Sequence, residues 1–190
     1  MTTTKKLVVA VVALSLALVT VVGATLAFLI AESNVVTNKF TYGTITIELA
    51  ENNKSDKDGL EFTNVVPGDV LPKDPVVTVT KGSEECYVYV LIDNQLGTAA
   101  TYNITDDWTE VSSNTNGTKK LYRYDETVNA LTEAKDLRVF TTLTFATGLD
   151  VKAVEALAGK NVVITAFAHQ SENTDVGTAN TAAIAWAELN

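Results

Sequence analysis

Histidine and cysteine, the side chains most typical of catalytic zinc sites and thiol nucleophiles, are rare in this sequence. The chain contains one histidine, His169, and one cysteine, Cys86. A catalytic zinc ion normally takes three protein ligands with a carboxylate base nearby, and the helical motif His-Glu-x-x-His is absent from the sequence. One histidine and one cysteine, each expected in its own strand, form a poor ligand set. We therefore expect no catalytic residue, no bound metal and no cofactor.

Other polar and aromatic groups permit weaker hypotheses. Cys86 lies in an apolar segment, which favours a buried, unreactive thiol over a nucleophile, since a nucleophile needs a neighbouring base. Asp56-Lys-Asp58-Gly59 and Asp106-Asp107 could hold calcium, but the first lacks the opening aspartate and the closing glutamate of a calcium loop. We interpret both as solvated turns and leave calcium binding open.

Three aromatic residues, Trp108, Tyr122 and Tyr124, lie in two neighbouring segments with strand character. Side chains of this kind either form a face on which a carbohydrate stacks or pack against each other across paired strands. We interpret them as cross-strand packing.

The segments that must position these groups have mainly the two-residue period of strands. We expect strands at Phe40–Leu49, Leu60–Val66, Val76–Thr80, Glu85–Asp93, 102–104, Trp108–Val111, Lys119–Tyr124, Leu137–Leu149 and Asn161–Gln170. Glu85–Asp93 is apolar on both faces, which predicts a central position in a sheet. Short helices are expected at Asp150–Ala158 and Thr181–Leu189, and a loop at Asp125–Asp136. The pattern predicts an all-β fold, an antiparallel jelly roll or β-sandwich with one or two short peripheral helices.

The N-terminus has the layout of an export signal. Two lysines, Lys5 and Lys6, precede an uncharged run at Leu7–Ala31. Small residues in that run predict a signal-peptide cleavage site between Ala27 and Phe28. Cleavage there would take the formal net charge from −9 to −11. An acidic chain of this kind disfavours nucleic acid as a partner. The alternative is an uncut transmembrane helix, for which the run is long enough; in both cases the remainder lies outside the cytoplasm.

Several blocks, in order along the chain, resemble the TasA/camelysin (CalY) family of SipW-dependent biofilm matrix fibre proteins. The blocks are the leader end Gly23–Ala27 before Phe28; Phe40, Gly43, Ile45 and Ile47; Pro67-Gly68-Asp69 followed by Lys73-Asp74; Cys86–Val90; and Leu157–Lys160, Ala166–Gln170 and Ala185-Trp186. The stretch from Gln95 to Asp136 has no counterpart that we can name.

The resemblance implies a jelly-roll domain at 40–190, a signal peptide at 1–27 removed by a SipW-type signal peptidase, and a mature N-terminal segment at 28–39. It also implies a non-enzymatic, secreted subunit of extracellular fibres, bound head-to-tail to copies of itself, with the membrane involved only through the uncleaved precursor. The apolar residues Phe28, Leu29, Ile30, Val35 and Val36 would form the strand that one subunit donates to the next, a contact that sheet-edge chemistry permits.

Two alternative functions remain open. An uncut leader would make the protein a membrane-tethered surface binding module. Camelysin relatives have been classed as metallopeptidases, so the second alternative is a secreted metallopeptidase that would have to use His169.

Overall fold

The computed structural model describes residues 43–51, 65–113 and 117–190. The chain divides into two compact units, Met1–Thr41 and Tyr42–Asn190, and the described residues belong to the second unit. Several predictions therefore lie outside the described residues. These are the leader, the cut between Ala27 and Phe28, the donor segment 28–39, the turn at Asp56–Gly59 and most of the expected strand Leu60–Val66.

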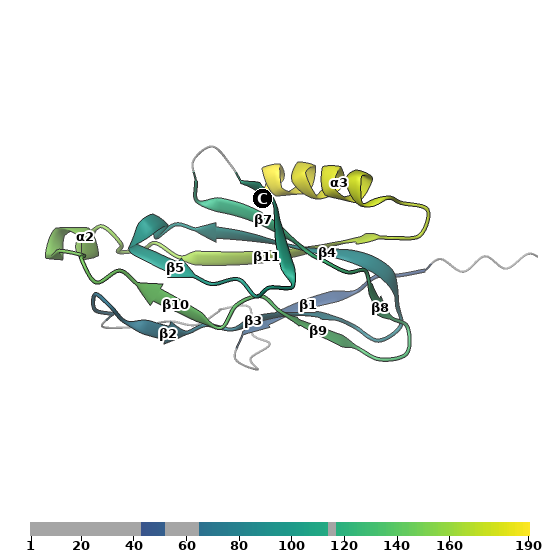
Figure 1. Cartoon of the computed structure of the whole chain (residues 1–190), viewed down its shortest axis with the longest axis horizontal. Helices are drawn as coiled ribbons and strands as arrows, with labels where there is room; N and C mark the ends of the chain where they lie inside the picture. Colours follow the sequence, from purple (N-terminus) through teal and green to yellow (C-terminus); the bar gives the residue numbers. More distant parts are fainter. Residues whose placement is uncertain (1–42, 52–64, 114–116) are drawn as a thin grey trace, which may run out of the picture. The chain divides into compact units, whose positions relative to one another are not determined.

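The described residues form eleven strands, one 3₁₀ turn and two α-helices (Figure 1). The strands are β1 Ile47–Glu51, β2 Val70–Pro72, β3 Pro75–Val79, β4 Ser83–Asn94, β5 Ala100–Tyr102, β6 Trp108–Ser113, β7 Lys119–Tyr124, β8 Val128–Ala130, β9 Lys135–Arg138, β10 Thr142–Phe145 and β11 Val162–Gln170. The helices are η1 Gly97–Ala99, α2 Val151–Glu155 and α3 Val176–Leu189. Every strand pair is antiparallel, so the predicted all-β class with two short helices is confirmed.

The strands form two layers. In the first, the ladder β1-β3-β9 continues into β2-β10-β5. The continuity comes from Lys73 N–H, which donates to Thr141 O over 3.1 Å, and Val139 N–H, which donates to Pro75 O over 2.9 Å. The second layer has the order β11-β4-β7-β6, and β8 pairs with the N-terminal end of β4. The central position predicted for Glu85–Asp93 is confirmed, because β4 pairs with β11 on one side and with β7 and β8 on the other.

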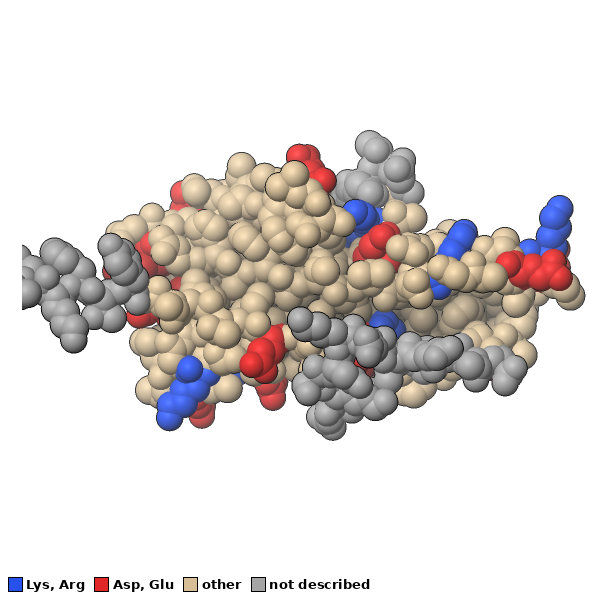
Figure 2. Space-filling view, turned by 180° about the vertical axis from the view of Figure 1, so that it is seen from behind, with Lys and Arg blue, Asp and Glu red and all other residues tan. Residues whose placement is uncertain are grey.

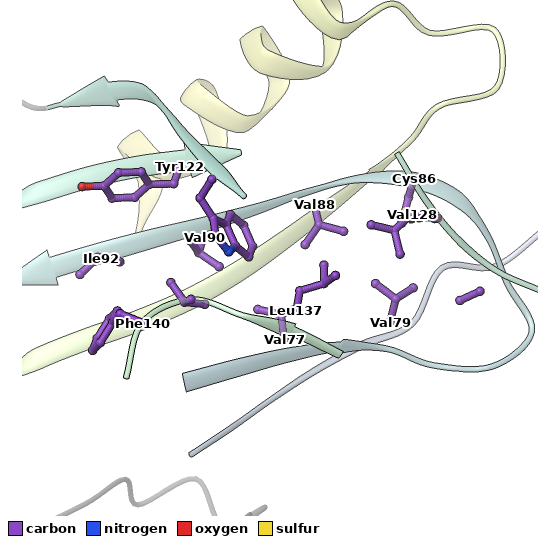
Figure 3. Close-up of a cluster of buried hydrophobic side chains, with 13 residues drawn as sticks. Val77, Val79, Cys86, Val88, Val90, Ile92, Tyr122, Val128, Leu137 and Phe140 are labelled. Carbon is purple, nitrogen blue, oxygen red and sulfur yellow. Dashed lines mark hydrogen bonds between the residues drawn. The ribbon is translucent and has the colours of Figure 1, made fainter. Parts of the chain in front are cut away.

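The main core lies between the two layers (Figure 3). Val77 and Val79 of β3 and Leu137 of β9 face Val88 and Val90 of β4, and all five side chains are at most 5% exposed. Complete burial of such a side chain stabilises the fold by about 1.5–3 kcal/mol. Because these apolar side chains alternate along their strands, each strand turns the same face toward the core between the layers.

The second layer is covered on its outer face by α3 (Figure 1). Asp175 begins the helix, since its side chain accepts a hydrogen bond from Thr178 N–H, an N-cap geometry. Ala179 and Ala183 are fully buried against the sheet, and the ring of Trp186 stacks on Phe167 of β11 with centroids 5.2 Å apart. The second layer therefore has both faces buried in its middle.

Two predicted elements near residue 130 were wrong. The expected loop Asp125–Asp136 contains β8 and the start of β9, and the expected single strand Leu137–Leu149 is divided into β9 and β10. The division occurs at Val139 and Phe140, which are fully buried in the core. Because the break itself is apolar, the sequence pattern carries no polar signal of it.

The helix predictions were closer to the structure. Asp150 caps α2 as predicted, accepting from Ala153 N–H over 2.7 Å, and Gly159 follows it with a positive φ of 76°. The C-terminal helix begins at Val176 rather than near Thr181. Its first turns contain Gly177, Thr178 and Asn180, residues of low helix propensity, and the cap at Asp175 compensates for them.

Candidate functional site

The two residues that could have formed a catalytic or metal site lie on opposite faces of the second layer. Gln170 pairs with Cys86 and His169 pairs with Tyr87 in the β11–β4 ladder. The Cys86 side chain is buried in the core between the layers, whereas the His169 ring lies 6.3 Å from the Phe167 ring on the face covered by α3. Because neighbouring residues of a strand point to opposite faces, the sheet separates the thiol from the imidazole.

The Cys86 thiol is also poorly suited to ionise. Burial, with a further contribution from the negative charge of Glu85, raises the pKa of the thiol to about 11. Its Sγ lies 3.8 Å from Val128 O. The predicted burial of Cys86 is confirmed, and the raised pKa of the thiol agrees with the prediction that it is unreactive.

Carboxylates do not gather with these groups either. In the parts of the chain that the structure describes, no three His, Cys, Asp or Glu side chains are grouped so that they could hold a metal ion. Asp106 and Asp107 lie in an exposed turn. Figure 2 shows one face of the molecule, on which acidic and basic side chains are interspersed rather than collected into a patch of one sign.

The aromatic residues pack across strands as predicted. Trp108 of β6 lies directly opposite Tyr124 of β7, with ring centroids 5.3 Å apart at an angle of 73°. Trp108 and Tyr122 are 5% and 6% exposed and belong to the core. Trp108 and Tyr122 therefore stabilise the interior, and Tyr124 packs against them while it remains partly exposed.

A strand edge remains as the feature best able to bind a partner. β11 forms one edge of the second layer, and among the described strands it pairs only with β4. It has nine residues in continuous register, with the sequence Val-Val-Ile-Thr-Ala-Phe-Ala-His-Gln, and contains neither proline nor a Lys, Arg, Asp or Glu. Unprotected edges of this kind are templates for another strand.

The other edge strands have features that discourage pairing. β6 carries Glu110 and an irregular register between Glu110 and Ser112, and β9 carries Lys135, Asp136 and Arg138. β1 carries Glu48 and Glu51, β2 has three residues and ends in a proline, and β5 has three residues. Charges, bulges, prolines and shortness are the usual protections of sheet edges.

The backbone groups at the β11 edge can be assigned from the ladder. Gln95 N–H donates to Asn161 O, and Ser171 N–H donates to Glu85 O, so the odd-numbered residues of β11 bond to β4. In an antiparallel pair the alternate residues then direct their N–H and C=O groups away from the partner. Among the residues that do so are four apolar ones, Val162, Ile164, Ala166 and Ala168. Their side chains also pack on the core between the layers and remain partly exposed.

β1 of the other layer borders this edge, and we call the border between β1 and β11 the open seam. The two strands converge near one corner of the fold, where Thr44 O accepts from Glu84 N–H and Glu85 O accepts from Ser171 N–H. Cα atoms of β1 come within 8 Å of Cα atoms of β11. Among the described residues, however, no ladder joins the two strands. Ile47 and Leu49 of β1 are partly exposed on their side of the seam, like the four residues of β11.

The opposite border, between β6 and β9, is closed by hydrogen bonds, and we call it the closed seam. The Trp108 indole N–H donates to Arg138 O over 2.8 Å, and the Thr105 hydroxyl donates to the same oxygen over 3.0 Å. Thr105 N–H donates to Val139 O over 2.9 Å. Among the described residues, these hydrogen bonds join the two layers along the closed seam, whereas no ladder joins β1 to β11 along the open seam.

Sequence reasoning expected the donor strand but did not identify the acceptor. Part of the signal was present in the sequence, since Asn161–Gln170 is one of two predicted strands, with Leu137–Leu149, in which no charge or proline interrupts nine consecutive residues. Whether that strand lies at an edge or in the centre of a sheet depends on pairing, which the sequence pattern does not give. Searches of protein-family models, curated proteins and solved structures found no match to this chain. Neither helix among the described residues has the length and apolar character needed to cross a membrane.

Proposed function

We propose that this protein is a secreted structural subunit that polymerises into extracellular biofilm-matrix or cell-surface fibres. In this proposal a signal peptidase of the SipW type cuts between Ala27 and Phe28, and the domain that remains is a jelly roll. The segment 28–39 of one copy then adds to the outer edge of β11 in the next copy. The protein has no enzymatic role and requires no cofactor.

The unprotected edge of β11 is the observation that supports this proposal. Four apolar residues on this edge direct both backbone hydrogen-bonding groups outward, and their side chains lie partly exposed over the core. An added strand would satisfy these backbone groups and cover the apolar side chains at the same time. Each ladder hydrogen bond contributes about 0.5–1.5 kcal/mol net, and the covered side chains add a hydrophobic contribution.

The donor and the acceptor are different surfaces, so the contact is head-to-tail. Contacts of this type generate filaments unless rotation closes them into a ring. The segment that begins Phe28-Leu29-Ile30 supplies large apolar side chains at a free chain end, and strand addition uses such side chains for specificity. A single kind of subunit would therefore suffice for a fibre.

The first test concerns the chain end and the polymer. N-terminal sequencing of the exported protein should give Phe28 as the first residue, and electron microscopy of that protein should show fibres. A variant that lacks Phe28–Val36 should remain monomeric. An intact Met1 or Thr2 would instead support the membrane-tethered alternative, and fibres of the same form from the truncated variant would refute strand donation.

A second test locates the acceptor at the level of single amides. A synthetic peptide with the sequence of Phe28–Val36, added in excess to the truncated variant, should slow hydrogen exchange at the outward N–H groups of Ile164, Ala166 and Ala168. Exchange at Thr165 and Phe167, whose N–H groups already bond to β4, should change far less. A peptide of the same composition in scrambled order serves as the control. Protection at another edge and not at β11 would contradict the assignment of the acceptor.

A further inference from the structure

A lysine and a glutamate are buried together where the first layer passes from β2 to β3. Lys73 is 7% exposed, and Ser83 is the other buried polar residue among those described. The Lys73 ammonium donates a hydrogen bond to Oε1 of Glu51, the last residue of β1. The two side chains retain 9% and 13% of their exposed area, so this ion pair is largely removed from water.

The second oxygen of the same carboxylate has no partner. Glu51 Oε2 is buried and accepts no hydrogen bond from any described residue. Two charges removed from water are expensive unless all of their hydrogen-bonding groups are satisfied. The desolvation free energy of a buried ion pair is therefore increased here by that of an oxygen without a hydrogen bond.

The backbone on both sides of the pair is held in place. Lys73 N–H donates to Thr141 O over 3.1 Å, and Glu51 lies opposite Pro75 in the β1–β3 ladder. Groups fixed in contact react as though at effective concentrations on the order of 10⁵–10⁸ M. An amine and a carboxyl group held together in this way can condense to an amide that would not form between the same groups free in water.

We propose that Lys73 and Glu51 are joined by a covalent amide bond in the mature protein. One ammonium proton first passes to Oε2 of Glu51, and the neutral Lys73 Nζ then attacks Glu51 Cδ. The N–C bond forms, and the bond from Cδ to Oε2 breaks. Two protons from the ammonium leave with that oxygen as one water molecule, so the reaction needs neither an oxidant nor a co-reactant. The product is neutral, and the oxygen that is lost is the one without a hydrogen-bond partner.

Two other lysine–glutamate pairs among the described residues provide internal controls. Lys120 and Glu110 lie 2.9 Å apart with side chains 41% and 40% exposed, and Lys135 and Glu133 are 44% and 69% exposed. In water these ions are well solvated and free to separate. They lack the burial of the Lys73–Glu51 pair, so we expect them to remain salt bridges.

The bond would close the end of β1 onto the junction of β2 and β3. β1 is the first described strand after the N-terminal segment, so a pull on that segment is transmitted into β1. A covalent link at Glu51 would keep β1 from peeling away from β3 under such a pull. This inference does not depend on the proposed fibre, because the bond lies within one chain.

The test is the mass of the intact, denatured protein. The wild-type chain should weigh one water less than its sequence, and a peptide map should contain a branched peptide that joins Glu51 to Lys73, with no tryptic cleavage after Lys73. Lys73→Arg keeps the positive charge but cannot form this amide, so its mass should equal that of its sequence. Lys120→Arg, the matched control, should retain the deficit of one water.

A wild-type mass equal to the sequence mass would overturn the proposal. A deficit that persists in Lys73→Arg would also overturn it, because the water would then come from another reaction such as ring closure at Asp58-Gly59. Both readings are made on denatured protein, so they remain valid if Lys73→Arg folds poorly. Fibre formation is assayed separately, and its failure would leave the mass result unaffected.

Discussion

The closed seam and the open seam differ in the hydrogen bonds that join the two β-layers. At the closed seam, Trp108 and Thr105 donate three hydrogen bonds from the β6 side to backbone oxygens at and just beyond the end of β9. At the open seam, β1 and β11 lie near each other without a ladder between them in the described part of the chain. β6, one of the two edge strands of the closed seam, carries a charge and an irregular register, whereas β11 carries neither.

This difference shows where the fold has been protected against further pairing. A long, uncharged edge invites the strand of another molecule, and soluble proteins usually protect such edges. Here the protection is present on β6 and absent on β11, although both are edges of the same sheet. A reserved binding edge explains this asymmetry better than a general lack of protection would.

The largest effect is expected from a proline on the open edge. The N–H of Ala166 points away from β4, so Ala166→Pro removes a hydrogen-bond donor from the free edge and none from the β11–β4 ladder. We expect the variant to fold and to lose fibre formation completely, as measured by electron microscopy and sedimentation.

The matched control is Glu110→Pro on β6. The ladder of β6 with β7 places the Glu110 N–H on the outer side of that edge as well, since Asp125 N–H donates to Asp107 O and the bonded residues alternate from there. Fibres should form normally from this variant. Loss of fibres in both variants would mean that the two edges do not differ in the way we argue.

A large effect on stability is expected at the closed seam. Trp108→Ala removes a side chain that is 5% exposed together with its hydrogen bond to Arg138 O. Replacement of a buried tryptophan by alanine costs about 3–5 kcal/mol, which urea unfolding followed by circular dichroism would measure. Trp186→Ala is the control on α3, where the ring is only half-buried, and it should cost less. An equal loss of unfolding free energy in the two variants would mean that the contacts of Trp108 at the closed seam contribute no more stability than those of Trp186.

An intermediate effect is expected from a charge on β11. Val163 is 43% exposed and its side chain lies on the face opposite the core-facing residues, so Val163→Lys should leave the fold intact. A lysine on an edge strand is a natural protection against pairing. Fibre growth followed by light scattering should slow several-fold without being abolished, while Val163→Thr should grow at nearly the wild-type rate. An unchanged rate for the lysine variant would argue against β11 as the acceptor.

Much of the fold could be predicted because its strands have a clear alternation of side chains. Lys119–Tyr124 was predicted with its observed bounds, and the central position of β4 followed from its two apolar faces. The failures occurred where alternation is uninformative. Val139 and Phe140 are buried at a break between strands, and the short strand Val128–Ala130 has one apolar residue on each side of a polar one.

The candidate site was less accessible from sequence, for a physical reason. The composition of β11 could be read in advance, but an edge is defined by the absence of a neighbour, and neighbours are set by long-range pairing. The contact between Lys73 and Glu51 was likewise not visible, because 22 residues separate the two side chains. Local patterns predict elements, whereas the binding edge and the buried pair arise from their arrangement.

The smallest effect is expected from the ion pair on the protected edge. Lys120 Nζ donates to Glu110 Oε2 over 2.9 Å, and this hydrogen bond is the main reason that the pKa of Lys120 is raised above its usual 10.5. Both side chains are about 40% exposed, so the pair stabilises the fold by only about 0.2–1 kcal/mol. We expect Glu110→Gln to lose this amount at neutral pH.

The pH dependence of that loss has a definite sign. A raised lysine pKa contributes stability that is fully present below 10.5, the unfolded value, and disappears as the pH rises through the higher folded value. The difference in unfolding free energy between wild type and Glu110→Gln should therefore stay constant at neutral pH and shrink above 10.5. Urea unfolding at neutral pH and at a pH above 10.5 measures this difference in unfolding free energy. A salt concentration of about 1 M should reduce the difference as well. If the difference does not change with pH, the pair does not act through the Lys120 charge. A small value would place the role of Glu110 in keeping other strands away from β6 rather than in holding β6 in place.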